Sequence, residues 1–462
     1  MLGVFGIVLS LVLLMYLAYR GINVLILAPL LSLLAVLIGG GAPLLATYTQ
    51  VFMVSLGGYL IKYFPLFLLG AIFGKLMDDS GSAKAIAHFI VQKLGQGQAV
   101  LAIVLSCGIL TYGGVSLFVV AFAVYPIAAA LFREAGVPKR FIPATIALGA
   151  FTFTMTALPG TPSIQNAIPM PFFGTTPFAA PVLGTIGALI MFGGGMLWLR
   201  FRSRRAMAAG EAYGDHPEEA VDRVDESGLP GFWTALTPII VVIVLNLVFS
   251  KMVIPGWDTA YLAAAKYGET ELKAVLGIWS IICALLSAIV VLIGIHWKTW
   301  VDIKDSVNKG TMGSLLPIFN TASEVGYGAV IASLAAFVIV RDFVVNLSPG
   351  NPLISEAVAV TTLAGITGSA SGGMSIALNT LGKTYLEMAT AAGISPDLLH
   401  RVASMASGGF DTLPHNGAVI TLLAICKLTH RDSYADIFMV AVAVPAIATI
   451  AVITLGTLFG SF

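Results

Sequence analysis

The feature that most constrains this chain is a succession of apolar runs, many about 18 residues or longer, from one end to the other. Of its 462 residues, 58% are hydrophobic and 10% are charged, whereas a soluble domain has about 25% charged residues. Such a chain has too few polar side chains to cover a soluble globule. It also lacks the ~10-residue alternation of an outer-membrane barrel. The sequence therefore predicts an all-α polytopic membrane protein.

Several apolar runs are long enough to cross a membrane as single helices. Two mildly amphipathic segments, 82–94 and 298–309, are predicted to lie along the membrane surface instead. The predicted spans lie near residues 2–19, 22–40, 57–77, 179–199, 232–250, 274–296, 313–340 and 435–459.

Lysine and arginine set the predicted orientation, because cytoplasmic loops carry an excess of them. The longest polar stretch, residues 200–231, begins RFRSRR and is predicted to be a cytoplasmic loop. With this loop inside, and with the two hairpins described below counted as re-entrant, both termini lie outside. A few basic residues, Arg401 among them, are then expected on the outer side.

Glycine and proline are abundant for lipid-facing helices, with 49 and 22 residues. Two regions, 139–173 and 396–430, are predicted to be helices broken near mid-membrane, the first at Pro159-Gly160 and the second at Pro414. Proline removes a backbone donor and glycine weakens a helix, so a break is expected at each place. Broken helices of this kind are typical of transporters.

A hairpin precedes each predicted broken helix. The regions 98–132 and 353–392 each hold two apolar arms around a Gly-Gly pair, which marks the predicted tip. Each could be two full spans or one re-entrant hairpin, and we predict the hairpin. The same order of motifs then occurs in 1–199 and in 232–462, with opposite predicted orientation. This pattern indicates an inverted repeat, which places a substrate site near the membrane midplane.

The tips and breaks suit an anionic substrate. A broken helix leaves free N–H groups that attract anions, helped by the helix dipole. Hydroxyl and amide side chains there can donate to carboxylate oxygens and accept from a hydroxyl group. These side chains could also do no more than cap the broken helices. The predicted substrate-binding residues are Thr111, Gly113, Gly114, Ser116, Thr161, Ser163, Gln165, Asn166, Ser371, Gly372, Gly373, Ser375, Asn379, His415 and Asn416.

Three ionisable residues within apolar regions are candidates for proton coupling. Ionisable groups deep in a membrane are costly and are functional candidates by default. Asp411 and His415 stand four residues apart beside the second break, and Glu324 lies within the predicted span 313–340. A histidine can exchange a proton near neutral pH, and His415 could also meet the substrate directly. The alternative is that Asp411 and His415 only hold the broken helix together.

The same segments resemble a known family. Residues 68–83 (LLGAIFGKLMDDSGSA) are similar to the gluconate permease family of proton symporters. Residues 110–118 (LTYGGVSLF), 140–143, 152–156 and 413–423 (LPHNGAVITLL) are closer to its branch described as D-3-hydroxybutyrate permease-like. The resemblance implies proton-coupled uptake of a small hydroxy-carboxylate, 3-hydroxybutyrate or a gluconate-like acid, by alternating access.

The resemblance also carries expectations about architecture. It implies an ion-transporter-superfamily-like fold with two re-entrant hairpins, two broken helices and a homodimer. The expected location is the inner membrane of a bacterium, where the lipid bilayer and the carboxylate are the expected partners.

An enzyme is not expected. Residues 377–384 (ALNTLGKT) lack the first glycine of a phosphate-binding loop, and no His-Glu-x-x-His occurs. We expect no cofactor and no metal, and the net charge of +1 indicates no nucleic-acid partner. The coupling ion is predicted to be the proton. A sodium-coupled carboxylate transporter, an anion channel and a membrane enzyme stay open as alternatives.

Overall fold

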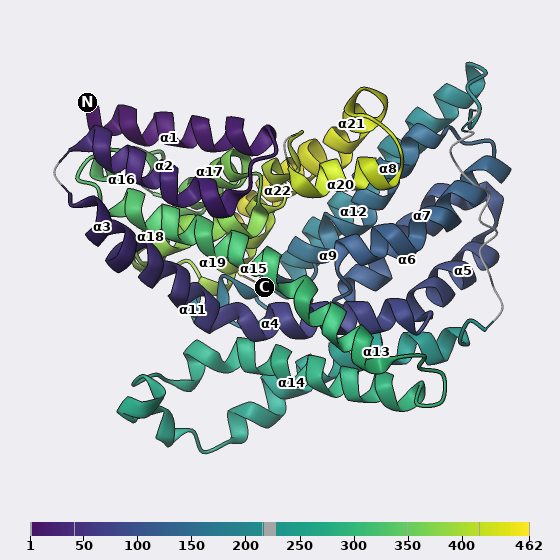
Figure 1. The fold of residues 1–462 in the computed structure, drawn as a ribbon, viewed down its shortest axis with the longest axis horizontal. Coiled ribbons are helices and arrows are strands. Elements are labelled where there is room, and N and C mark those ends of the chain that lie inside the picture. Colours follow the sequence, from purple (N-terminus) through teal and green to yellow (C-terminus); the bar gives the residue numbers. More distant parts are fainter. Residues whose placement is uncertain are drawn as a thin grey trace.

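A computed structural model describes residues 2–40, 42–214, 216, 228–348, 350–414 and 416–461. These residues form helices and connecting turns and no strand (Figure 1). The predicted all-α membrane fold is therefore confirmed. In this part of the chain, six helices are long and apolar enough to cross a membrane: Leu44–Asp79, Leu117–Glu134, Pro181–Ala208, Phe232–Gly256, Leu272–Ile295 and His430–Phe459.

The first half of the chain places a helix hairpin before a broken helix. Helices α6 and α7 form the hairpin arms, and residues 113–116 connect them. The broken helix follows as four short helices, with its main interruption at 157–163. The helices are α5 (Ser82–Leu94), α6 (Ala99–Tyr112), α7 (Leu117–Glu134), α8 (Ile142–Ala150), α9 (Phe153–Thr156), α10 (Ile164–Ala167) and α11 (Met170–Phe173).

The second half repeats this order. Its hairpin arms are α17 (Pro352–Thr367) and α18 (Ala370–Ala391), and its broken helix consists of α19 (Pro396–Ser407) and α20 (Gly417–Ile425). The hairpin turns at Gly368, which has a φ of +65°. The predicted tip at the next glycine pair is therefore wrong, because that pair lies inside α18.

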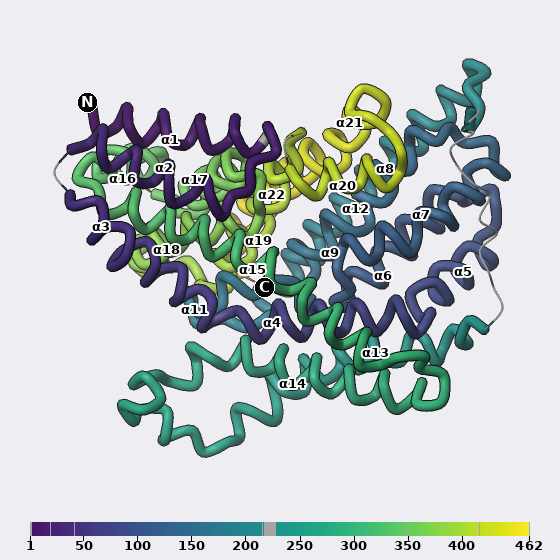
Figure 2. Tube along the Cα trace, viewed as in Figure 1, coloured from purple at the N-terminus to yellow at the C-terminus, as the bar shows by residue number. Residues whose placement is uncertain are grey.

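The remaining helices surround these elements. Figure 1 shows α13 and α14 along the lower edge, and Figure 2 shows the C-terminal helices beside the first broken helix. Three π-helical segments adjoin longer helices: Thr47–Phe52 leads into α4, Phe249–Val253 extends α13, and Met439–Ala443 extends α21. The surrounding helices are α1 (Leu2–Tyr19), α2 (Val24–Gly39), α3 (Leu44–Ala46), α4 (Met53–Asp79), α12 (Pro181–Ala208), α13 (Phe232–Val248), α14 (Leu272–Ile295), α15 (Ile303–Ser333), α16 (Phe337–Val345), α21 (His430–Phe438) and α22 (Val444–Phe459).

Two predicted boundaries are wrong. The predicted span 313–340 is not one helix, because α15 ends at Ser333 and α16 leaves at an angle of 98°. The predicted surface segment 298–309 is largely the first two turns of α15. In addition, α12 continues to Ala208, so the first residues of the predicted cytoplasmic loop are helical.

Helices α4 and α15 pack closely against one another. A Cβ placed on Gly310 of α15 would lie 2.8 Å from the Cα of Ile72 in α4, so this contact needs glycine. The close approach brings the middle of α15 to one wall of the cavity described below.

A cluster of charged residues joins α12, α21 and the start of the first broken helix. Asp436 is 1% exposed. It accepts hydrogen bonds from Trp198 Nε1 (3.0 Å) and Arg202 Nε (3.1 Å), and Arg140 Nη1 lies 3.4 Å away. Arg140 also donates to both carboxylate oxygens of Glu211 (2.6 and 2.9 Å), and this holds the pKa of Glu211 below its usual range.

Replacing this buried carboxylate should destabilise the fold. Asp436→Asn keeps one acceptor but turns an amide toward two guanidinium groups, so we expect a loss of about 3 kcal/mol. Thermal unfolding of the detergent-purified protein measures it. Asp305→Asn is the control, because it removes an exposed carboxylate in the first turn of α15 together with its ion pair to Lys309 (2.8 Å), and both contribute little. An Asp436→Asn protein that unfolds at the same temperature as the wild type would contradict this stabilising role of Asp436.

Candidate functional site

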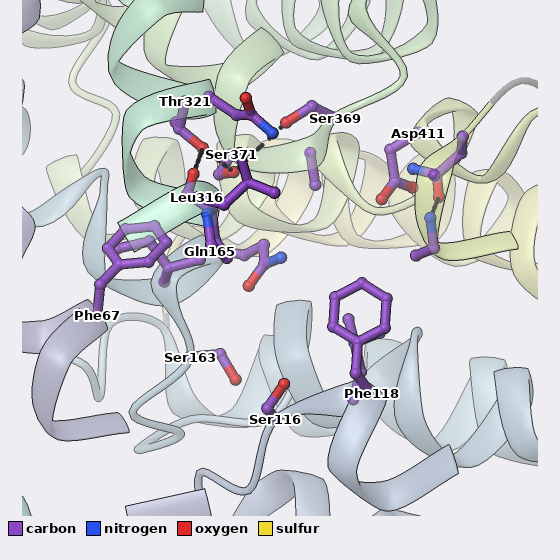
Figure 3. Close-up of a pocket in the computed structure, with 18 of the residues that line it drawn as sticks. Phe67, Ser116, Phe118, Ser163, Gln165, Leu316, Thr321, Ser369, Ser371 and Asp411 are labelled. Carbon is purple, nitrogen blue, oxygen red and sulfur yellow. Dashed lines mark hydrogen bonds between the residues drawn. The ribbon is translucent and has the colours of Figure 1, made fainter. Parts of the chain in front are cut away.

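A cavity of about 750 Å³ lies where the two hairpins and the two helix breaks meet (Figure 3). Helices α4 and α15 and the turn between α1 and α2 complete its walls. Its polar lining residues are Asn23, Thr111, Ser116, Ser163, Gln165, Ser314, Asn320, Thr321, Glu324, Thr367, Ser369, Ser371, Asp411 and Asn416.

The structure brings many of the predicted site residues to this one cavity, although they come from distant parts of the sequence. Those that line it are Thr111, Gly114, Ser116, Ser163, Gln165, Glu324, Ser371, Asp411 and Asn416. Those that do not are Gly113, Thr161, Asn166, Gly372, Gly373, Ser375 and Asn379. His415 lies outside the described residues.

The predicted glycines off the cavity serve close packing. A Cβ on Gly113 would lie 2.6 Å from Cγ2 of Ile239 in α13. A Cβ on Gly373 would overlap the backbone of Ala364 in α17, so this glycine lets the two arms of the second hairpin touch. Gly372 leaves room for the carboxyl group of Glu324, which a Cβ at this position would overlap.

The predicted polar residues off the cavity have other surroundings. Ser375 is buried, and its Oγ has no hydrogen-bond partner within the described residues. Asn379 lies on an exposed face of α18 and donates to the Ser375 carbonyl (2.8 Å). The hydroxyl groups of Thr161 and Ser163 form a hydrogen bond with each other (2.8 Å), and Asn166 faces away from the cavity toward α19.

Asn416 ties the second hairpin to the second break. Its Nδ2 donates to the Gly368 carbonyl (2.7 Å) at the hairpin turn. Its Oδ1 accepts from the backbone N–H groups of Ala418 (2.6 Å) and Val419 (3.0 Å), which caps α20. One side chain therefore fixes the relative position of two cavity walls.

Two carboxyl groups line the cavity without a cationic partner among the residues that the structure describes. Glu324 is 3% exposed and lies against Gly372 in the first turn of α18. Within the described residues, neither Glu324 nor Asp411 forms an ion pair, and one carboxyl oxygen of each lacks a hydrogen-bond partner. An isolated buried charge is costly, so such groups are suited to binding a proton, a cation or a polar ligand.

Arg401 has surroundings that the sequence did not predict. Its place on the outer side stays a prediction, but the side chain is not at the surface, because it is wholly buried between α19 and the first broken helix. Nη1 donates to the Thr156 carbonyl (3.1 Å) at the end of α9 and to Asn166 Oδ1 (3.2 Å). Nη2 donates to the Ala179 carbonyl (2.8 Å). An arginine in the second broken helix thus binds the oxygens exposed by the first break.

His400 extends this contact, and its tautomer follows from the network. Asn166 Nδ2 donates to the carbonyls of Thr161 (3.0 Å) and Pro177 (2.9 Å), so its Oδ1 must be the acceptor toward His400 Nε2 (3.1 Å). His400 Nε2 therefore carries a proton, and Nδ1 accepts from the Thr175 hydroxyl (2.6 Å). In the sequence, the signal for His400 and Arg401 was that two ionisable residues stand side by side in a mostly apolar segment.

Side chains also satisfy the carbonyl groups of the first break. Tyr112 donates to the Pro159 carbonyl (2.7 Å), and Asn246 Nδ2 of α13 donates to the Gly160 carbonyl (3.0 Å). The Gly160 N–H donates to the Pro177 carbonyl (2.8 Å). The break is therefore a defined structure rather than an unwound segment.

Known proteins resemble this chain along most of its length. A family model described as GntP family permease matches residues 1–313. An uncharacterized transporter of Bacillus subtilis (strain 168), YxjC, is 46% identical over 467 residues, which cover 98% of both chains. An uncharacterized transporter of Haemophilus influenzae is 29% identical over 182 residues, covering 39% of this chain and 41% of that protein.

Two solved transporters share the fold. Neisseria gonorrhoeae MtrF, described as illuminating a class of antimetabolite efflux pumps, aligns with a TM-score of 0.56 at 13% identity over 90% of this chain and 84% of its own. The Alcanivorax borkumensis YdaH transporter aligns with a TM-score of 0.54 at 16% identity, covering 89% and 88%. The family model covers more than half of the chain, and the chain therefore belongs to the GntP family of permeases, which are membrane transporters.

Proposed function

We propose that the chain is a secondary active transporter that carries a small hydroxy-carboxylate across the membrane by alternating access, coupled to protons. Candidate substrates are 3-hydroxybutyrate and gluconate-like acids. The observation that carries the proposal is the cavity, on which hydroxyl groups, amide groups, helix N-termini and two carboxyl groups converge. Membership of the GntP family supports the transport function.

The lining suits a molecule that is both an anion and an alcohol. Helices α7, α18 and α20 all begin at the cavity wall, and helix N-termini favour negative charge. Gln165, Thr321 and Ser371 offer donors and acceptors to a substrate hydroxyl. Phe67 and Phe118 provide apolar surface for a short carbon chain (Figure 3).

Glu324 and Asp411 are the proposed proton carriers. Both line the cavity, so each can respond to a substrate bound there. His415 stays a candidate by its position next to the second break. The oxygens of Glu324, Thr321 and Ser371 also suit a hard cation, which keeps sodium as the alternative coupling ion. A bacterial inner-membrane location and a homodimer belong to the proposal through the family resemblance.

The coupling ion can be identified by uptake into proteoliposomes. With an inward proton gradient and no sodium, we expect 3-hydroxybutyrate or gluconate to accumulate, by up to about tenfold per pH unit for each coupled proton. Accumulation that requires a sodium gradient at equal pH would replace the proton with sodium. Flux that never exceeds equilibration would instead indicate a channel.

Removing a cavity carboxyl should separate transport from proton coupling. In Glu324→Gln or Asp411→Asn, we expect exchange of labelled for unlabelled substrate to continue while pH-driven accumulation is lost, because an amide cannot exchange a proton. Glu356→Gln is the matched control. Glu356 is a buried carboxyl of α17 whose oxygens have no partner in the described structure, and it does not line the cavity.

The control variant should accumulate substrate as the wild type does. Wild-type accumulation in both cavity variants would contradict the assigned role of these two carboxyl groups. Loss of accumulation in Glu356→Gln alone would indicate that Glu356, outside the cavity, carries the coupled proton.

A further inference from the structure

Three helices that begin at the hairpin turns and at the second break do not begin in the same way. Helix α18 is capped from within, since Ser369 Oγ accepts from the Gly372 N–H (3.0 Å). Helix α20 is capped by Asn416, as described above. Helix α7 begins after Ser116, whose side chain lines the cavity but makes no capping hydrogen bond. Of these three N-termini, only that of α7 lacks a side-chain acceptor among the residues that the structure describes.

The uncapped N-terminus of a helix as long as α7 can bind an anion. Helix α7 has 18 residues. Its first-turn N–H groups have no acceptor within the helix, and its dipole places partial positive charge at the cavity. In α18 and α20, a side chain already accepts hydrogen bonds from some of the first-turn N–H groups. An anion in the cavity therefore gains most at α7.

A second feature at this end of the cavity also indicates a ligand. Thr111, on the other side of the hairpin turn, is 2% exposed and lines the cavity. Its Oγ1 has no hydrogen-bond partner among the residues that the structure describes. A buried hydroxyl without a partner is costly, so a bound acceptor would satisfy it. Ser116 and Ser163 direct their hydroxyls into the same space (Figure 3).

The opposite wall disfavours an anion. It carries Glu324 and Asp411 beside the two capped helices. No lysine or arginine is among the described residues that line the cavity, so no such side chain draws a carboxylate to that wall. The cavity is therefore polarised between an end rich in donors and an end that holds carboxyl groups.

We infer that the N-terminus of α7, with Thr111, Ser116 and Ser163, binds the carboxylate group of the substrate. The hydroxyl-bearing end then points toward Glu324 and Ser371 on the opposite wall. This assignment rests on the proposed function and adds to it the orientation of the substrate in the cavity.

Ser116→Asp tests the assignment, because it places a carboxylate where the substrate's own would bind. Aspartate is a good N-cap residue, so the variant should fold and unfold at or above the wild-type temperature. We expect its Kd for 3-hydroxybutyrate, gluconate or lactate, measured by calorimetry, to rise about tenfold or more. The uncharged 3-hydroxybutyramide should show no such loss.

Ser395→Asp is the matched control. Ser395 is the N-cap residue of α19, its Oγ accepts from the Asp397 N–H (3.2 Å), and it lies outside the cavity. The variant adds the same charge at another helix N-terminus, and its Kd should equal that of the wild type. Ser163→Asp serves as a second variant if Ser116→Asp does not fold, with the same expected loss.

The outcomes separate this assignment from the function on which it rests. Wild-type affinity in the folded aspartate variant would overturn the carboxylate position and leave the transport proposal standing. Failure of the wild-type protein to bind any of the three acids would overturn both the substrate class and the assignment. Equal losses of affinity in Ser116→Asp and Ser395→Asp would show a general charge effect and would overturn the assignment.

Discussion

The arrangement of the cavity depends on one buried cation. Arg401 is 0% exposed, and within the described residues it binds only uncharged oxygens. A guanidinium without water is costly unless its donors are satisfied, and here the carbonyls of Thr156 and Ala179 and the amide of Asn166 accept from it. These oxygens lie beside the first break, whereas Arg401 belongs to the second broken helix. The need to satisfy this charge holds the two breaks together.

The consequence for the cavity follows from short distances along the chain. Asn166, which accepts from Arg401 and His400, comes directly after Gln165 and three residues after Ser163. Both Ser163 and Gln165 line the cavity. On the other side, Asn416 joins the second hairpin turn to α20. The two halves of the chain therefore present their polar groups to one volume.

The sequence predicted those features that local chemistry or bilayer thickness determines. Pro159 with Gly160, and Pro414 shortly before Gly417, combine a lost backbone donor with a weakened helix, so both breaks could be located. A single proline is not enough, because Pro65 and Pro126 lie inside α4 and α7. Features that depend on packing could not be predicted. Gly372 and Gly373 resemble a turn in the sequence, but they provide close contacts inside α18, and the turn lies at Gly368.

The same distinction applies to the candidate site. Glu324 and Asp411 could be found because charge is rare in apolar segments, and the structure places both at the cavity. The burial and the partners of Arg401 could not be predicted, because the sequence does not show which oxygens face a given helix. Asn23 and Thr321 line the cavity but were missed, since a polar residue in a turn or a helix is ordinary. Their role depends on which helices meet there.

We propose that the cavity between the breaks and hairpins is the transport site. This proposal is tested most directly by introducing one cysteine at Ala418, which lines the cavity, in a protein whose Cys107, Cys283 and Cys426 have been replaced. If the substrate binds there, 3-hydroxybutyrate or gluconate slows modification of this cysteine by a thiol reagent, with the same concentration dependence as uptake. A modification rate that stays constant at substrate concentrations that saturate uptake would contradict the proposal.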